Sequence, residues 1–155
     1  MIFVTVGTDE HDFSRLIKKA DSLKGLDIVA QIGNTKYTPK NIKHFKFLEP
    51  SALETYYRKA DVIITHGGAG SIINSLKNGK IPIVVPRLKK FDEHINDHQL
   101  QLAKSLQEKG KAVCVIDMNK LEYHIKTSKT IKMKQSKEKR NLIQFLAGTL
   151  KAMEK

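Results

Sequence analysis

Short runs of apolar residues alternate along the chain with stretches in which apolar residues recur every three or four positions. Five runs are rich in β-branched and other aliphatic residues and predict buried strands, at residues 2–6, 26–32, 61–65, 81–85 and 112–116. A sixth run, residues 42–48, alternates apolar and polar side chains, which predicts a strand with one face in solvent. The polar residues 35–41 before it are typical of a turn.

Helical spacing fills most of the gaps between these runs. It is clearest after the first strand, where one predicted helical face carries Phe13, Leu16, Ile17, Ala20 and Leu23. Further helices are predicted over residues 50–60, from Ile72 to Asn78, from about Ile95 to Gly110, and from Met118 onward. Strands that alternate with helices predict βαβ units, and so a Rossmann-like α/β fold: a parallel sheet with helices on both faces.

The length of 155 residues is that of one domain with a sizeable core. We expect residues 1–118 to form the Rossmann-like domain and residues 119–155 to form a basic helical extension that packs on the same domain. One apolar stripe runs along the predicted C-terminal helix, made by Leu142, Ile143, Leu146, Leu150 and Met153.

The positive charge is concentrated near the C-terminus. The net charge is +12, and residues 120–155 hold ten of the 28 basic residues but three of the 16 acidic ones. Such a segment can bind nucleic acid, an anionic membrane or an acidic partner, or can simply be a solvated helix. The low aromatic content of 6%, the lack of Trp and the lack of a recognition motif argue against nucleic acid.

The chain has one cysteine, Cys114, so it cannot form an internal disulfide, which fits a reducing compartment. Its position inside an apolar run predicts a buried, unreactive thiol. The apolar runs are far shorter than the ~20 residues of a membrane span, and the first residues do not have the pattern of a signal peptide. We therefore expect a soluble, cytoplasmic protein.

Ligands of open parallel sheets bind beyond the carboxyl ends of the strands. Three polar segments follow predicted strands: residues 7–12, 66–71 and 86–99. In the second, three glycines let a backbone approach a ligand closely, and the next helix directs free N–H groups at it, which favours a phosphate or diphosphate. The spacing matches neither Gly-x-Gly-x-x-Gly nor a P-loop, and a plain strand-to-helix turn without a ligand is the alternative.

Histidines in the other two segments have more than one interpretation. His94 and His98 are four residues apart, so a zinc site on one helix face is possible, as is a hydrogen-bonding cluster that includes Asn96 and Gln99. His11 is either a general base or an exposed loop residue. The chain has no Asp-x-Asp pair, so we expect no bound divalent metal.

Three blocks of sequence together resemble the glycosyltransferase family 28. They are Val4-Thr5-Val6-Gly7-Thr8, Thr65-His66-Gly67-Gly68-Ala69-Gly70-Ser71-Ile72, and Val85-Pro86-Arg87 leading to Glu93-His94-x-x-Asp97-His98-Gln99. The likeness covers residues 1–110 and is greatest to short members that consist only of the C-terminal, donor-binding half of a two-component transferase.

The resemblance implies the C-terminal half of a GT-B enzyme that binds a UDP-sugar. It places Thr8 and Gly67, Gly68, Ala69, Gly70 and Ser71 around the diphosphate, Phe47 and Leu48 at the uracil, and Asn74 at the ribose. It places His94, Asn96, His98 and Gln99 at the sugar and phosphates, and it adds His66 and Arg87 to the substrate-binding set. Many members read Gly-Thr-His-Glu-Gln after the first strand, whereas here Asp9 and His11 replace the His and the Gln. We assign no catalytic residue on this chain.

A chain that resembles only the C-terminal half of a GT-B enzyme also implies a partner subunit. The resemblance predicts a membrane-anchored acceptor-binding subunit that supplies the general base, with a lipid-linked saccharide as acceptor in surface polysaccharide synthesis. The reaction would be inverting and metal-independent. The basic C-terminal helix would dock on that partner or on the anionic inner leaflet, and the isolated subunit could form a homodimer. The alternative is a nucleotide-responsive binding module that recruits a partner and catalyses nothing.

Overall fold

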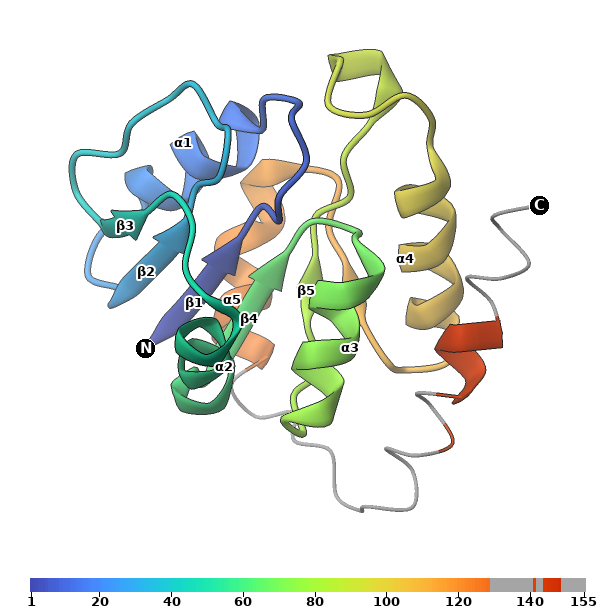
Figure 1. Cartoon of the computed structure of the whole chain (residues 1–155). Helices are drawn as coiled ribbons and strands as arrows, with labels where there is room; N and C mark the ends of the chain where they lie inside the picture. The colour runs from blue at the N-terminus through green and yellow to red at the C-terminus, as the bar shows by residue number, and fades with distance from the viewer. Residues whose placement is uncertain (129–140, 142–143, 149–155) are drawn as a thin grey trace.

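A computed structural model of the chain describes residues 1–128, 141 and 144–148 and contains one six-stranded, fully parallel sheet (Figure 1). The strands lie in the order β3-β2-β1-β4-β5-β6. Their bounds are β1 Ile2–Thr5, β2 Ile28–Gln31, β3 Lys43–Phe45, β4 Val62–Thr65, β5 Ile83–Val84 and β6 Val113–Cys114. The predicted Rossmann-like fold is confirmed.

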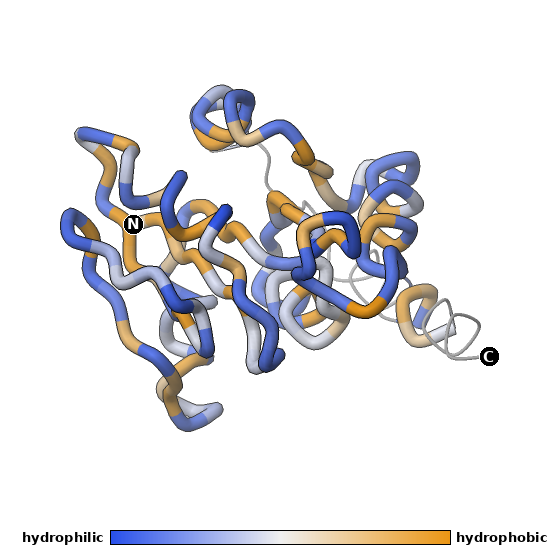
Figure 2. The backbone as a smooth tube through the Cα atoms, turned by 90° about the horizontal axis from the view of Figure 1, so that it is seen from above, coloured by the Kyte–Doolittle hydropathy of each residue, from blue (hydrophilic) through white to orange (hydrophobic). Residues whose placement is uncertain are grey.

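Helices cover both faces of the sheet. Their bounds are α1 Ser14–Ser22, α2 Pro50–Lys59, α3 Ala69–Lys77, α4 His98–Glu108 and α5 Leu121–Ser128, with short 3-10 helices η1 Lys89–Phe91 and η2 Met118–Lys120. Buried residues of α1 and α5 share one core with β1, whereas α2, α3 and α4 pack against the opposite face. In Figure 2 the apolar positions gather along the strands and the hydrophilic ones lie in the outer loops.

Most predicted strands are shorter in the structure, for example residues 42–48, of which only Lys43–Phe45 form β3, and several helices begin at other residues than predicted. Two of these differences have a clear local cause. The strand predicted at residues 81–85 is reduced to β5, which begins after Pro82 because proline has no N–H to donate to a ladder. The helix predicted from Ile95 begins three residues later, at His98, and the Ile95 side chain is 70% exposed. The side-chain oxygen of Asn96 accepts a hydrogen bond from the His98 N–H (3.0 Å), which satisfies one free donor at the start of α4.

Residues near the C-terminus contact the same domain. Leu146 is fully buried among residues of α3 and α4, and the Lys109 ammonium lies 4.4 Å from the centre of the Phe145 ring. Of the apolar stripe predicted along this segment, Leu142, Ile143, Leu150 and Met153 lie outside the described residues, as do most of its lysines. Within the described part of the chain, no helix has both the length and the apolar character needed to span a membrane.

The connection from β2 to β3 has no helix and is held instead by one buried carboxylate. Asp21 of α1 accepts hydrogen bonds from the Tyr37 hydroxyl (2.6 Å), the Lys40 N–H (3.0 Å) and the Asn41 N–H (2.7 Å). Burial raises the pKa of Asp21, but these hydrogen bonds outweigh burial and hold the pKa below its ordinary value. The carboxylate therefore substitutes for helix packing and fixes edge strand β3.

We expect Asp21→Asn to lower the free energy of unfolding at pH 7 by about 2–3 kcal/mol, because an amide presents a donor to groups that need an acceptor. The folded pKa of Asp21 is depressed, so its stabilising contribution is present at neutral pH and is lost as the pH falls through that pKa. Urea unfolding at pH 7 and pH 3.5 measures both effects. Asp92→Asn is the control, because Asp92 is exposed and its φ of 57° suits asparagine. Equal losses in the two variants would contradict the assigned role of Asp21.

Candidate active site at the carboxyl ends of β1, β4 and β5

The three polar segments singled out from the sequence meet at one edge of the sheet. β1 and β4 are neighbours in register, with Thr5 opposite Thr65, and β5 lies on the far side of β4. Parallel strands end at the same edge, so the segments that follow β1, β4 and β5 come together there (Figure 1).

The glycine-rich turn ends in an uncapped helix. α3 begins at Ala69 after Gly68, and no side chain caps it. A Cβ added at Gly70 would meet no other described residue within 4 Å, so the side-chain direction of Gly70 in the first turn of α3 is open. Backbone N–H groups at a helix start carry partial positive charge and favour an anion. The N-cap residues of α1, α2 and α4 also provide no side-chain cap, so the glycines before and in the first turn of α3 are what suits this turn to a phosphate group.

His66 lies beneath the turn rather than in the open site. Its ring is buried, and a Cβ added at either Gly7 or Gly68 would overlap it. Its Nδ1 is 3.2 Å from the Thr65 hydroxyl. Burial, with the nearby Arg87 charge, lowers the pKa of His66 to about 3, so the imidazole is neutral at physiological pH. His66 therefore acts as an uncharged spacer that sets the height of both glycines.

Gln99 joins the turn to the end of β5. Its side-chain oxygen accepts hydrogen bonds from the Gly67 N–H and the Arg87 N–H, both at 3.1 Å. A Cβ at Gly67 would overlap the Gln99 side chain, so the approach requires glycine at that position. Among the described residues, no hydrogen bond uses the Gln99 side-chain N–H₂ group, which leaves this donor for the sugar contact predicted from the sequence.

Arg87 occupies a different position from the one expected of a substrate-binding arginine. The side chain is 0% exposed, and its guanidinium donates to the carbonyls of Val6 (2.8 Å), His11 (2.9 Å) and Glu93 (3.2 Å). The same group lies 4.7 Å from the centre of the Phe13 ring. The predicted direct ligand contact is therefore corrected: Arg87 joins strand and loops and is shielded from the open site.

Asp9 brings two histidines together in the first loop. One Asp9 oxygen accepts from both the backbone N–H (2.8 Å) and ring Nδ1 (2.6 Å) of His11, and the other lies 3.7 Å from His94 Nε2. Partial burial raises the pKa of Asp9, but the His11 hydrogen bonds and the Arg87 charge hold it below its ordinary value. The carboxylate thereby orients the His11 ring, and within the described part of the chain no hydrogen bond uses its Nε2, a geometry compatible with the general-base interpretation.

His94 and His98 do not lie together on one helix, the arrangement that the zinc alternative required. His94 precedes α4, whereas His98 is its first residue and is exposed. Asn96 lies between them in sequence, and its side-chain oxygen accepts the hydrogen bond from the His98 N–H at the start of α4. The i, i+4 geometry on which the zinc interpretation depended is absent, and His94 instead lies beside Asp9.

The remaining predicted contacts lie around the same edge. Ser71 and Asn74, on the first two turns of α3, interact with the hydroxyl of buried Tyr57. Phe47 follows β3 and is 46% exposed, and Thr8 is exposed in the loop after β1. Ser71 and Asn74 thus lie on α3 itself, Thr8 follows Gly7, and Phe47 lies beside Gly33; their contacts with a ligand stay predictions.

Two features of the site were missed from the sequence. Buried Glu93 accepts from Arg15 of α1 (2.9 Å) and from the Leu88 N–H (3.3 Å), so the loop after β5 is braced against α1. Nothing local indicates that pairing, because the two charges are 78 residues apart. The contact of Asp9 with His11 had a signal, since an aspartate often accepts from the backbone two residues on.

The model of the glycosyltransferase family 28 C-terminal domain matches residues 1–153. The chain belongs to this family. It is 34% identical over 121 residues to the UDP-N-acetylglucosamine transferase subunit ALG13 of Homo sapiens, covering 70% of this chain but 10% of that protein.

Two other relatives agree. A UDP-N-acetylglucosamine--N-acetylmuramyl-(pentapeptide) pyrophosphoryl-undecaprenol N-acetylglucosamine transferase of Bdellovibrio bacteriovorus is 36% identical over 99 residues, which is 58% of this chain and 26% of that one. Among solved structures, the glycotransferase of kitacinnamycin matches 96% of this chain and 38% of its own, with a TM-score of 0.59 and 19% identity, which supports the fold. The chain therefore corresponds to a fraction of each relative.

We call the carboxyl ends of β1, β4 and β5, with the loops that follow them, the active edge. Away from it, Cys114 is half-buried in β6 and forms no disulfide. The sequence predicted a fully buried thiol, which is corrected to a half-buried one. Burial raises the pKa of the thiol, and its low reactivity stays a prediction.

The glycines of this family 28 turn predict opposite responses to alanine. Gly68→Ala should destabilise the protein by about 1–3 kcal/mol, because the new methyl group overlaps the His66 ring. Gly70→Ala should stabilise it by up to about 1 kcal/mol, because the methyl group meets nothing and alanine favours the helix. Urea unfolding of the two variants measures the difference. Equal stabilities would show that His66 does not fill the space under Gly68.

Stability should also fall with acid because of His66. The folded pKa of about 3 lies below the ordinary 6.5, so the unfolded state binds the extra proton and stability is lost as the pH falls below 6.5. Between pH 7 and pH 5 we expect wild type to lose about 2 kcal/mol more than His66→Gln, which cannot titrate. An NMR titration that shows the His66 ring protonated at pH 5 would contradict this assignment.

Proposed function

We propose that this chain is the donor-binding part of a UDP-sugar glycosyltransferase. Membership of family 28 supports the reaction class, and the names of the human and bacterial relatives support a UDP-sugar donor. The observation that carries the proposal is the uncapped first turn of α3, which opens into free space at Gly70. A diphosphate is the anion that such a turn accommodates, with the nucleoside toward Phe47.

The proposed chemistry is electrostatic. As the bond from the anomeric carbon to UDP breaks, negative charge grows on the diphosphate, and the fixed N–H groups of Ala69, Gly70 and Ser71 stabilise it. These donors need no rearrangement, since Gln99 and His66 already hold the turn. In the proposed step the acceptor hydroxyl attacks the anomeric carbon from the side opposite UDP, so the transfer would invert the configuration of that carbon. No metal would be needed.

The acceptor and the rest of the enzyme are proposed to lie on a partner subunit. The human relative is named as a transferase subunit, and the name of the bacterial one includes undecaprenol, a lipid carrier, which supports a lipid-linked acceptor. The braced loop after β5 exposes Phe91 (49%) and Ile95 (70%) beside the site, and such apolar residues favour burial against another chain. We place the general base on that membrane-anchored partner, and the reaction at the cytoplasmic face of the membrane in surface polysaccharide synthesis.

Calorimetric titration of the purified chain with UDP, ADP, GDP and inorganic diphosphate tests the donor site. We expect saturable binding of UDP, and a loss of at least about tenfold in affinity for Gly70→Val, whose side chain would occupy the space before the turn. Gly148→Val is the matched control, because Gly148 is exposed and a Cβ there also meets nothing within 4 Å.

Tight binding of ADP in place of UDP would contradict the donor assignment and leave the phosphate-binding turn intact. Equal affinity of the two glycine variants for UDP would show that the turn is not part of the binding site. Turnover of a UDP-sugar on adding the partner distinguishes an enzyme from a nucleotide-responsive module that only recruits that partner.

A further inference from the structure

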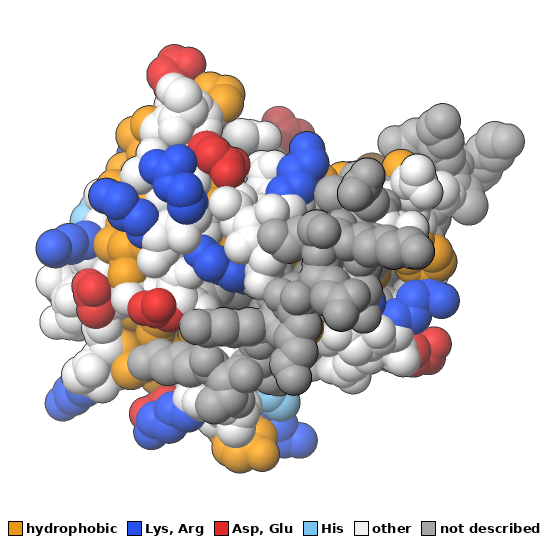
Figure 3. All heavy atoms as spheres, turned by 90° about the horizontal axis from the view of Figure 1, so that it is seen from below, with side chains coloured by type: hydrophobic (Ala, Val, Ile, Leu, Met, Phe, Trp, Pro, Cys, Tyr) orange, Lys and Arg blue, Asp and Glu red, His pale blue; other side chains and the backbone are white. Residues whose placement is uncertain are grey.

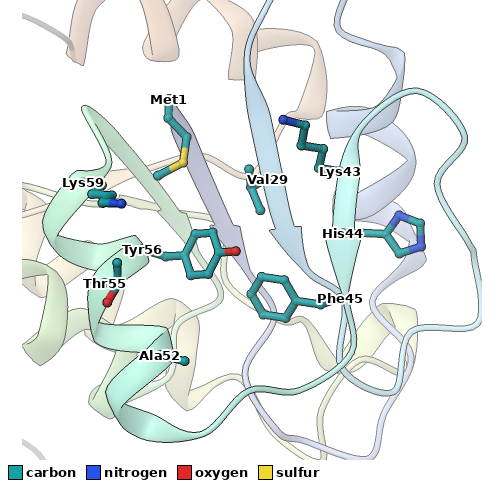
Figure 4. Close-up of a pocket in the computed structure, with 9 residues that line it drawn as sticks. All are labelled: Met1, Val29, Lys43, His44, Phe45, Ala52, Thr55, Tyr56 and Lys59. Atoms are coloured by element: carbon teal, nitrogen blue, oxygen red, sulfur yellow. The ribbon is translucent and has the colours of Figure 1, made fainter.

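A hollow lies away from the candidate active site, on the face of the sheet that α2 covers. α2 packs over β1 and β4, where Tyr57 and Ala60 contact Phe3 and Ile63. The same face of β2 and β3 stays open beside the helix and forms a hollow of about 540 Å³ (Figure 4). We call it the α2–β3 hollow. Its volume is in the range of sites for small organic molecules.

Aromatic and aliphatic side chains make up the floor of the α2–β3 hollow. The rings of Phe45 on β3 and Tyr56 on α2 have their centres 5.1 Å apart. Val29 of β2 lines the hollow nearer the amino ends of the strands (Figure 4). Tyr56 also stacks on Phe3 at 5.4 Å. The rings are thus fixed from below, and the floor is a rigid apolar surface that an aromatic group can pack on.

The rim of the hollow is cationic. Lys43 comes from β3 and Lys59 from the last turn of α2, and Figure 4 shows both side chains directing their nitrogen atoms toward the hollow from opposite sides. No acidic residue lines the hollow, and within residues 1–128, 141 and 144–148 neither ammonium has a carboxylate partner. Seen from the amino ends of the strands, apolar side chains are exposed among charged side chains of both signs (Figure 3), and the acidic Asp27 and Asp61 pair with the N-terminal ammonium of Met1.

We propose that the α2–β3 hollow binds a small organic anion that joins a planar apolar group to a carboxylate, sulfate or phosphate. The apolar group would pack on Phe45 and Tyr56, and the anionic group would accept a charge-assisted hydrogen bond from Lys43 or Lys59, which line opposite sides of the hollow. The volume accommodates one such molecule, and the lack of any lining acid selects against cations. This site is independent of the nucleotide proposed at the start of α3.

The aromatic sulfonate 8-anilinonaphthalene-1-sulfonate is a suitable probe, because its fluorescence rises in an apolar site. We expect saturable binding of one molecule per chain. Lys43→Gln with Lys59→Gln should weaken it by about tenfold, since both charged donors are lost. Lys104→Gln with Lys120→Gln removes the same charge from exposed positions elsewhere and should leave the affinity unchanged.

Three further measurements locate the probe. Thr55→Trp places an indole in the hollow from α2 and should abolish binding, with circular dichroism as the check on folding. Saturating UDP should not displace the sulfonate, and the uncharged analogue N-phenyl-1-naphthylamine should bind at least about tenfold more weakly. The proposal would be overturned if the two double lysine variants bound the sulfonate equally well, or if UDP displaced the sulfonate fully. Equal affinity for the sulfonate and its uncharged analogue would also overturn it.

Discussion

The buried guanidinium of Arg87 is the interaction on which the active edge depends. It bonds the carbonyl at the end of β1, a carbonyl in the loop after β1, and a carbonyl in the loop after β5, so three segments far apart in sequence share one donor group. A charge taken out of water is costly unless its hydrogen bonds are made, and here strands and loops must be in place to make them. Correct assembly of the edge and burial of the charge therefore occur together.

A second consequence is that the site is organised before any ligand arrives. Neutral His66 supports Gly7 and Gly68, Gln99 holds Gly67 to the end of β5, and the Glu93 carboxylate braces the neighbouring loop through Arg15. Groups already fixed lose little conformational entropy on binding. The cationic charge of Arg87 lies below this layer, where it adds a positive field without contacting the open space.

Much of the fold and part of the site were visible in the sequence. The alternation of apolar runs with helical spacing predicted the parallel sheet, and the order of strands brought the three polar segments together as expected. Long-range pairs were not visible: Arg87 was placed on the ligand, and Arg15 was not considered, because their partners are set by tertiary packing. The start of α4 was placed too early because an exposed apolar residue, Ile95, continued the helical spacing by coincidence.

The open side of the active edge gives a physical reason for a second half. Stabilisation of a developing diphosphate charge by backbone donors is strong in a site from which water is excluded, and weak when the charge is solvated. On this chain, no other described residue lies within 4 Å of a Cβ built on Gly70, so that side of the first turn of α3 is open. The donors are therefore positioned here, but the dry surroundings in which they act most strongly would have to come from a second surface closing over the edge. The proposed function therefore requires such a covering surface in addition to the donors that this chain positions.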